Sequence, residues 1–188
     1  MKLVEIQEVE PHLILDIVYA TADNFMGERL YSSPHCFLDE EVARALNNAL
    51  HLLNKYSLGL KVWDGYRPTP IQQKMWDKIQ DERYVSNPQK EGGRHTRGTA
   101  VDLTLITLKG EELPMPTPFD SFESAAHSDY ISLSPEVLKN RALLKHVMES
   151  VGFKQLPTEW WHFDYEGWRD NKRFPPYDIS FKQLINTQ

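Results

Sequence analysis

The sequence predicts an α+β fold with a mainly antiparallel central sheet flanked by helices. Three stretches, roughly residues 39–59, 70–81 and 135–150, repeat apolar residues at the spacing of amphipathic helices. Shorter apolar runs between them are typical of strands. Because the helical and strand-like stretches do not alternate regularly, an antiparallel arrangement is favoured over a doubly wound parallel sheet. We expect one domain over residues 1–188.

The N-terminal half is expected to form a strand, a helix, a second strand and a second helix, in this order. Residues 13–18 predict the first strand, and the aromatic, turn-rich stretch 19–34 that follows is long for a plain connector. Asp39 can cap the first helix, and Gly59 suits its end. A buried strand over residues 60–63 leads through the turn DGYRPTP into the second helix.

The C-terminal half begins with a polar, glycine-containing loop over residues 85–98. The strand expected over residues 99–107 has strong β-propensity. After the third helix, residues 153–155 and 161–165 predict a hairpin joined through LPTE. The tail from residue 168 onward is polar and aromatic, and we expect it to wrap the domain surface.

The composition is that of an ordinary globular protein, with 40% hydrophobic and 26% charged residues. A net charge of −6 argues against a nucleic-acid partner or an anionic membrane surface. The single cysteine, Cys36, excludes an intramolecular disulfide, and acidic residues interrupt the apolar runs near the N-terminus. We therefore expect a soluble, cytoplasmic protein without an export signal or a membrane span.

One carboxylate, Asp102, lies in an otherwise apolar strand within the stretch EGGRHTRGTAVDLTL, residues 91–105. A buried carboxylate needs an ionic partner, a proton or a metal ion. His95 upstream and His162 in the run TEWWHFDY are candidate partners. Two histidines and one acid match the three protein ligands of a catalytic zinc site, and Glu159 is left over as a base.

Spacing constrains where these residues lie. Residues 95 and 102 are an odd number of positions apart, as are 159 and 162, so the members of each pair would face opposite sides of a straight strand. His95 is therefore expected in the loop before its strand, and Glu159 in the LPTE turn or at a bulge, with His162 on the strand. The loop can bend at three glycines, Gly92, Gly93 and Gly98.

Spacing alone leaves a second interpretation open. Asp102 could form an ion pair with Arg94 or Arg97, and His162 could be a core histidine whose polar atoms are satisfied. The two interpretations differ in whether two segments that are distant in sequence converge on one point.

The motifs GRHTRGTAVDLTL and EWWHF resemble the two metal-binding signatures of the D-alanyl-D-alanine dipeptidases. These belong to the zinc DD-peptidases, which are related in fold to the Hedgehog signalling domain. WDGYRP, YATADNFMG and TPFD also resemble this branch and occur in the same order, so the resemblance covers nearly the full chain. It implies a zinc enzyme with one Zn²⁺ per chain that hydrolyses D-alanyl-D-alanine. The setting stays open between glycopeptide resistance, turnover of the cell wall and its peptidoglycan, and use of the dipeptide as a nutrient.

The resemblance also implies roles for single residues. It assigns the zinc ligands to His95, Asp102 and His162. Glu159 is expected to be the general base and later the proton donor. Arg67 in WDGYRP is expected to stabilise the oxyanion, and Asp120 in TPFD to receive the ammonium group of the substrate.

One position departs from the family pattern. The family usually has a serine two positions before the first zinc histidine, where this chain has Gly93. The substrate carboxylate therefore needs other donors. The candidates are Arg94, Arg97, Tyr19, Thr21 and Tyr31.

Alternative functions stay open on the sequence. One is a related zinc D,D-carboxypeptidase or cell-wall endopeptidase with a longer substrate, and another is a non-catalytic zinc-binding module. The presence of both Glu159 and Arg67 argues against the latter. Arg67 could also be a surface arginine paired with Asp64, and Asp120 could cap the segment after it. The expected partner is a small dipeptide, and a homo-oligomer is possible.

Overall fold

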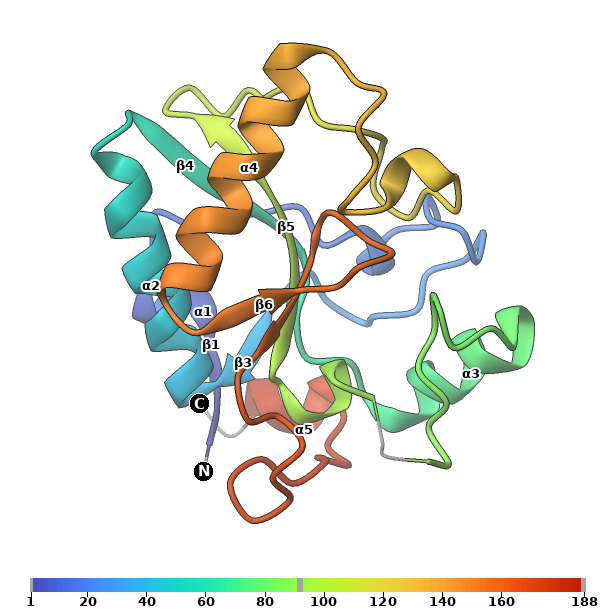
Figure 1. The fold of residues 1–188 in the computed structure, drawn as a ribbon. Coiled ribbons are helices and arrows are strands. Elements are labelled where there is room, and N and C mark those ends of the chain that lie inside the picture. Colours follow the sequence, from blue (N-terminus) through green and yellow to red (C-terminus); the bar gives the residue numbers. More distant parts are fainter. Residues whose placement is uncertain (1, 91–92, 187–188) are drawn as a thin grey trace.

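The computed structural model describes residues 2–90 and 93–186, and its centre is a five-stranded sheet (Figure 1). The strand order is β2 (Ile14–Leu15), β4 (Leu58–Asp64), β5 (Ala100–Thr107), β7 (His162–Tyr165) and β6 (Phe153–Gln155). β2 pairs with β4 in parallel, whereas the other three pairings are antiparallel. The predicted α+β fold with a mainly antiparallel sheet is confirmed.

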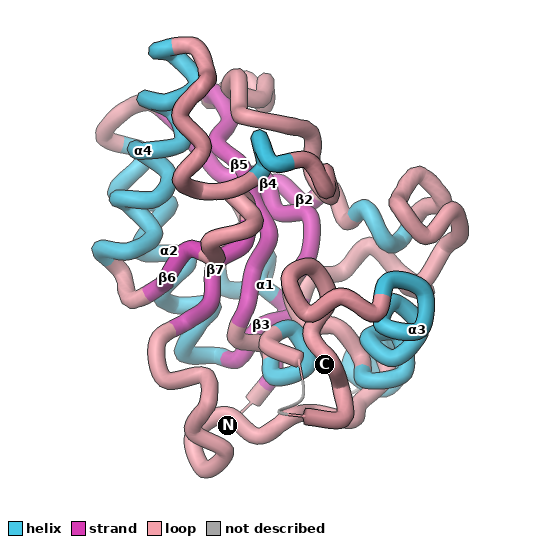
Figure 2. Tube along the Cα trace, turned by 45° about the vertical axis from the view of Figure 1, so that its right-hand side comes forward, coloured by secondary structure: helices cyan, strands magenta, loops and turns pink. Residues whose placement is uncertain are grey.

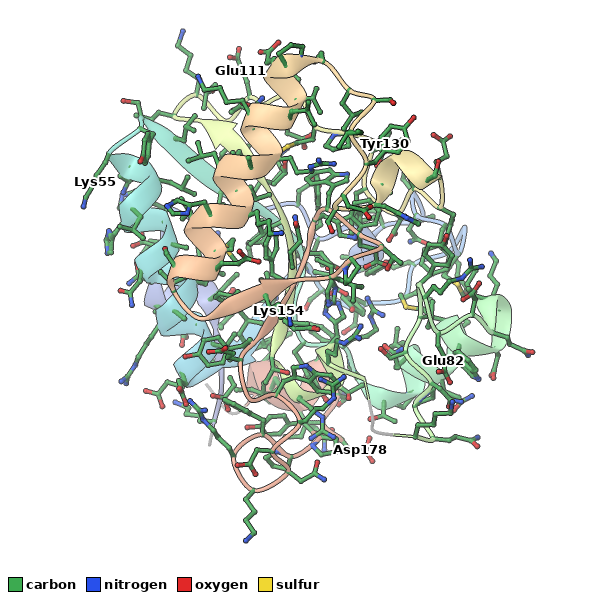
Figure 3. The ribbon with its side chains drawn as sticks, in the orientation of Figure 1. Lys55, Glu82, Glu111, Tyr130, Lys154 and Asp178 are labelled. Atoms are coloured by element: carbon green, nitrogen blue, oxygen red, sulfur yellow. The ribbon has the colours of Figure 1, made fainter. Side chains whose placement is uncertain are left out.

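Two long helices cover one face of this sheet, and α3 with several loops lies on the other side (Figure 2). Helix α2 (Glu40–Asn54) starts at Asp39, whose side chain accepts from the Glu41 backbone N–H. Helix α4 (Pro135–Ser150) starts at Ser134, which caps it in the same way. Helix α3 (Thr69–Ile79) follows the DGYRPTP turn. Lys55 at the end of α2 and Glu82 beyond α3 lie on opposite sides of the molecule (Figure 3).

Several short elements were not predicted. β1 (Leu3–Glu5) pairs antiparallel with β3 (Phe37–Asp39), α1 (Ile6–Val9) follows β1, and the tail contains α5 (Phe181–Asn186). The strand predicted over residues 13–18 is wrong beyond Leu15, because the chain turns into the 3-10 segment η1 (Val18–Ala20). These elements are too short to carry a periodic pattern of their own.

Three adjacent strands contribute one row of polar side chains. Asp64 on β4 lies opposite Asp102 on β5, and Asp102 lies opposite His162 on β7. Directly opposite residues of an antiparallel pair face the same side of the sheet. The pairing register shifts between Val62 and Asp64, and this irregularity brings Asp64 level with Asp102. Asp102 and His162 of this row line a pocket that Gln72 and Met75 of α3 also line.

Within residues 2–90 and 93–186, the helices are too short or too polar to cross a lipid bilayer.

Gly98 brings the loop before β5 into close contact with β3. A Cβ atom at this position would lie 2.6 Å from Leu3 Cδ2 and 2.8 Å from the Asp39 nitrogen. The backbone φ angle is +64°, which favours glycine. The Gly98 carbonyl accepts a hydrogen bond of 2.9 Å from the Asp39 N–H. This contact anchors the loop that contains His95.

We expect Gly98→Ala to destabilise the protein more than Gly27→Ala. Gly27 also has a left-handed φ of +73° but has nothing within 4 Å of a Cβ atom, so both variants carry backbone strain and only Gly98→Ala adds overpacking. Overpacking typically costs about 1–3 kcal/mol. The measurement is the free energy of unfolding in urea. Equal losses in the two variants would contradict the close approach.

Candidate metal centre and active site

Three buried side chains from distant segments converge on one point. The ligand atoms of His95, Asp102 and His162 all lie within 4.8 Å of one another. His95 Nε2 is 3.3 Å from His162 Nδ1, and the Asp102 carboxylate oxygens are 2.8 Å from His162 Nδ1 and 3.4 Å from His95 Nε2. Two imidazole nitrogens and one carboxylate that face each other form a donor set that could hold a metal ion.

The other ring nitrogens of the two histidines are held from outside the cluster. His95 Nδ1 is 2.7 Å from the Gly65 carbonyl oxygen, and His162 Nε2 is 2.8 Å from Asp164 Oδ1. Metal-binding histidines usually donate their second N–H to a carboxylate or a backbone carbonyl, and this selects the nitrogen that faces the metal. Both the donor atoms and the partners of the second ring nitrogens therefore fit a metal site.

The charges in the cluster favour a cation at its centre. Burial lowers the pKa of His95 to about 3, so this imidazole is neutral, as a metal ligand must be. Burial also disfavours a charged His162, but Asp164 and Asp102 outweigh it and raise the pKa of His162 to about 10. Burial acts to raise the pKa of Asp102, but the two histidines lower it. A proton on His162 thus supplies the positive charge that a metal ion would bring.

The predicted locations of these residues are confirmed. His95 lies in the 3-10 turn η2 (His95–Arg97) before β5, Glu159 lies between β6 and β7, and His162 is the first residue of β7. The interpretation in which Asp102 pairs with an arginine is wrong. Arg94 instead forms an ion pair of 3.0 Å with Asp164.

Arg97 donates from Nη1 to the Asn171 side chain and to the Phe174 carbonyl. Of the three glycines expected to bend the loop, Gly92 lies outside the described residues.

Glu159 is a buried carboxyl group beside the cluster. Its Oε2 atom is 3.8 Å from His162 Nδ1, and its side chain is about one-tenth exposed. Among the described residues, no donor forms a hydrogen bond with this carboxyl group. Burial, the main cause, raises the pKa of Glu159 to about 8. The group can therefore both take up and release a proton near neutral pH.

Arg67 is also buried, and its guanidinium group is held on two sides. Nε and Nη2 donate to Asp64 Oδ2 at 3.2 and 2.7 Å, and Nη1 donates to Gln72 Oε1 at 3.0 Å. The expected ion pair with Asp64 exists, but the arginine is not on the surface, since it is 6% exposed. Asp64 also accepts a 2.8 Å hydrogen bond from Tyr31 and lies 3.8 Å from His95 Nδ1.

The donor cluster, Glu159 and Arg67 border one pocket of about 550 Å³ of empty space, open mouth included. Its polar lining includes His95, Asp102, His162, Glu159, Arg67, Arg94, Gln72, Tyr19 and Asp120. Aromatic side chains from three loops, Phe25, Tyr84 and Phe122, line it as well.

Asp120 lies in this pocket with an unusual backbone. Tyr19 donates to its two carboxylate oxygens at 3.1 and 2.9 Å, and burial is the main cause that raises the pKa of Asp120 to about 7. Its φ angle of +59° is uncommon for a residue with a side chain and is typical of functional sites. Asp120 does not cap the next turn, which follows Glu123.

Three of the candidate carboxylate donors, Arg97, Thr21 and Tyr31, do not line the pocket. Thr21 is exposed, and its hydroxyl donates to the Val18 carbonyl. Tyr31 is buried and donates to Asp64, behind Arg67.

Sequence comparison with known proteins shows the family of this chain. The sequence profile of the family described as D-ala-D-ala dipeptidase matches residues 1–180. The chain belongs to this family. The D-alanyl-D-alanine dipeptidase of Escherichia coli strain K12 is 34% identical over 163 residues, which cover 87% of this chain and 84% of that protein. The enzyme of the same name from Enterococcus faecium is 32% identical over 168 residues, 79% of this chain and 83% of that protein.

Solved structures with a similar trace are more distant. One is VanYB in complex with D-alanine-D-alanine, which is 16% identical, with a TM-score of 0.47 over 85% of this chain and 88% of that one. The assignment to the dipeptidase family therefore rests on the sequence matches.

Sequence reasoning missed two residues that support the site in this member of the dipeptidase family, Asp164 and Gln72, and it named Asp64 only as the partner of a surface arginine. Asp164 holds His162, Asp64 holds Arg67 from one side, and Gln72 holds it from the other. Asp164 could have been found, because it lies two residues after His162 on the same strand and so faces the same side. Gln72 had no comparable signal, because its contact with Arg67 depends on how α3 packs beside the sheet.

We expect Asp164→Ala to weaken metal binding by this dipeptidase-family protein about 10- to 100-fold, because His162 Nε2 loses its partner. The affinity for Zn²⁺ is measured by competition with a chromogenic chelator. The control is Glu166→Ala, which removes an exposed carboxylate near the end of the same strand. If both variants bind Zn²⁺ as the wild type does, Asp164 does not orient a metal ligand.

Proposed function

We propose that this protein is a zinc-dependent dipeptidase that hydrolyses D-alanyl-D-alanine to two D-alanines. The observation that carries the proposal is the convergence in one pocket of the three-residue donor cluster, the buried carboxyl group of Glu159 and the fixed guanidinium group of Arg67. The names of the relatives that are 34% and 32% identical support the choice of substrate.

The proposed metal is one Zn²⁺ ion held by His95, Asp102 and His162. Two imidazole nitrogens and one carboxylate are a known ligand set of catalytic zinc, which keeps a fourth position open. Zinc in such a site lowers the pKa of water from about 15.7 towards 7 and polarises the carbonyl group of the substrate. Glu159 is not counted among the ligands, because a fourth protein ligand would close the open position.

Glu159 is the proposed general base and acid. It takes the proton from the attacking water and later gives it to the nitrogen of the leaving D-alanine. Both transfers need a carboxyl group whose pKa lies near the working pH, and the raised pKa of Glu159 supports this role. The positive charge of a bound cation would lower that pKa again, which favours the ionised form that accepts a proton.

Arg67 is the proposed donor to the oxyanion that develops on the substrate carbonyl. Its guanidinium group stays charged at any relevant pH, and the ion pair with Asp64 holds it in place. A preoriented donor of this kind is worth about 100- to 1,000-fold in rate.

Recognition of the substrate ends is proposed for Asp120, Tyr19 and Arg94. Asp120 receives the ammonium group, and the Tyr19 hydroxyl orients the Asp120 carboxylate. Arg94 is the proposed partner of the substrate carboxylate, and its place in the pocket lining supports this. Since Thr21 is exposed outside the pocket, no substrate contact is proposed for it.

We expect Glu159→Gln to lower kcat about 100- to 10,000-fold while the protein keeps its zinc. The amide cannot take the proton from water, but it leaves the three proposed ligands unchanged. Activity is measured by the release of free D-alanine, and metal content by elemental analysis of the same sample. Loss of zinc together with activity would instead make Glu159 a ligand. Glu123→Gln, which changes an exposed carboxylate, is the control.

The substrate is tested with three peptides at equal concentration. We expect release of D-alanine from D-Ala-D-Ala, none of alanine from L-Ala-L-Ala, and little from a pentapeptide that ends in D-Ala-D-Ala. The names of the dipeptidase relatives support this preference. Cleavage of the pentapeptide alone would select the carboxypeptidase or endopeptidase alternative. No hydrolysis by the zinc-loaded protein would favour the non-catalytic zinc-binding module.

A role in cell-wall metabolism, a cytoplasmic location, a single domain over residues 1–188 and a homo-oligomer stay predictions.

A further inference from the structure

Gln72 is a buried amide whose oxygen and nitrogen each form one hydrogen bond. It lies on α3 with 1% of its surface exposed, and it borders the pocket. Its Oε1 accepts from Arg67 Nη1 at 3.0 Å, and its Nε2 donates to the Ser86 carbonyl at 2.7 Å. A buried amide is costly unless its polar atoms are paired, and when paired it is held in one orientation. Gln72 therefore links the loop at residue 86 to the guanidinium group.

Asp64 and Gln72 together determine which N–H groups of Arg67 face the pocket. A guanidinium group has five N–H donors, and the bonds from Nε, Nη1 and Nη2 use three of them. One N–H remains on each of Nη1 and Nη2 for a ligand. Nε and Nη2 both donate to one oxygen, Asp64 Oδ2, so the planar guanidinium group could pivot about this oxygen without a further contact. The bond from Nη1 to Gln72 removes this freedom and sets the direction of the Nη1 donor.

Position 93 lies against the same amide. A Cβ atom built on Gly93 would be 3.2 Å from both Cδ and Oε1 of Gln72. Such a contact is tight enough that the amide would have to move. A side chain at residue 93 would therefore disturb the hydrogen bond between Gln72 and Arg67.

We propose that Gln72 is a positioning residue for Arg67, and that position 93 is glycine because a side chain there would displace the Gln72 amide. The inference rests on the proposed function in one respect: Arg67 acts as the donor to the oxyanion. Gln72 itself takes no part in the chemistry. It determines where the remaining Nη1 donor points.

The test compares Gln72→Met with Gln73→Met. Methionine has a similar length and removes only the amide, and Gln73 lies next to it on α3, where its amide bonds the exposed Asp77 at 2.7 Å. We expect Gln72→Met to lower kcat on D-Ala-D-Ala about tenfold with little change in KM, the loss of roughly one hydrogen bond in the transition state. Binding of a phosphinate analogue of the dipeptide should weaken by a similar factor, with zinc content unchanged. Gln73→Met should match the wild type.

A second pair of variants tests the contact with position 93. Gly93→Ser should lower kcat in the wild-type background, whereas the same change should cost little more in Gln72→Ala, where the space is open. Equal losses in both backgrounds would show that residue 93 does not act through Gln72.

A spectroscopic measurement separates this inference from the proposed function. In ¹⁵N NMR spectra, the Arg67 guanidinium signals, assigned with Arg67→Lys, report rotation of that group without any turnover. We expect faster rotation in Gln72→Met than in Gln73→Met. If rotation, kcat and phosphinate affinity all stay as in the wild type, Gln72 is not a positioning residue. If the wild-type protein does not hydrolyse the dipeptide but Arg67 rotates faster in Gln72→Met, the proposed function fails and the positioning role holds.

Discussion

The buried carboxylate of Asp102 is the constraint on which the rest of the site depends. It lies in the central strand β5 with 3% of its surface exposed, where an isolated charge would be very costly. The protonated imidazole of His162, from the neighbouring strand β7, compensates it, and the neutral ring of His95, from the turn before β5, lies beside it. Because the two histidines come from opposite directions along the chain, they can meet Asp102 only when the sheet and the loop at Gly98 are both in place.

The pairing register of the sheet determines whether the neighbouring strands bring their polar side chains next to Asp102. Asp64, Asp102 and His162 form one row across β4, β5 and β7, and a slip of one residue would turn a strand's side chains to the opposite face. The turn after β4 then contributes twice to the site. Its Gly65 carbonyl holds His95, and two residues further Arg67 turns back onto Asp64. The end of β4 and the turn after it thus supply the Asp64–Arg67 ion pair and also orient His95 of the donor cluster.

Two carboxyl groups that line the pocket, Glu159 and Asp120, are buried without a hydrogen bond from a cation among the described residues. Asp64 is paired with Arg67. Glu159, in contrast, has His162 Nδ1 as a cationic neighbour at 3.8 Å, and Asp120 accepts from the Tyr19 hydroxyl. Burial raises the pKa of both Glu159 and Asp120. A divalent cation in the donor cluster would lower the pKa of both groups, since a nearby positive charge stabilises ionised carboxylates. The same arrangement that destabilises the metal-free pocket therefore favours a metal ion and, at Asp120, a substrate with an ammonium group.

The sequence by itself determined the features whose signal is local. Apolar periodicity located α2, α3 and α4, and alternation with β-propensity located β5 and the β6–β7 hairpin. Odd spacings placed His95 and Glu159 off the strands that follow them, and the isolated charge in an apolar run identified Asp102. The tertiary structure alone decided the two-sided support of Arg67 by Asp64 and Gln72, the exposure of Thr21, and the pairing of β1 with β3. These depend on contacts between segments far apart in the chain, which leave no periodic trace in the sequence, because packing and strand register arise only when the whole domain folds.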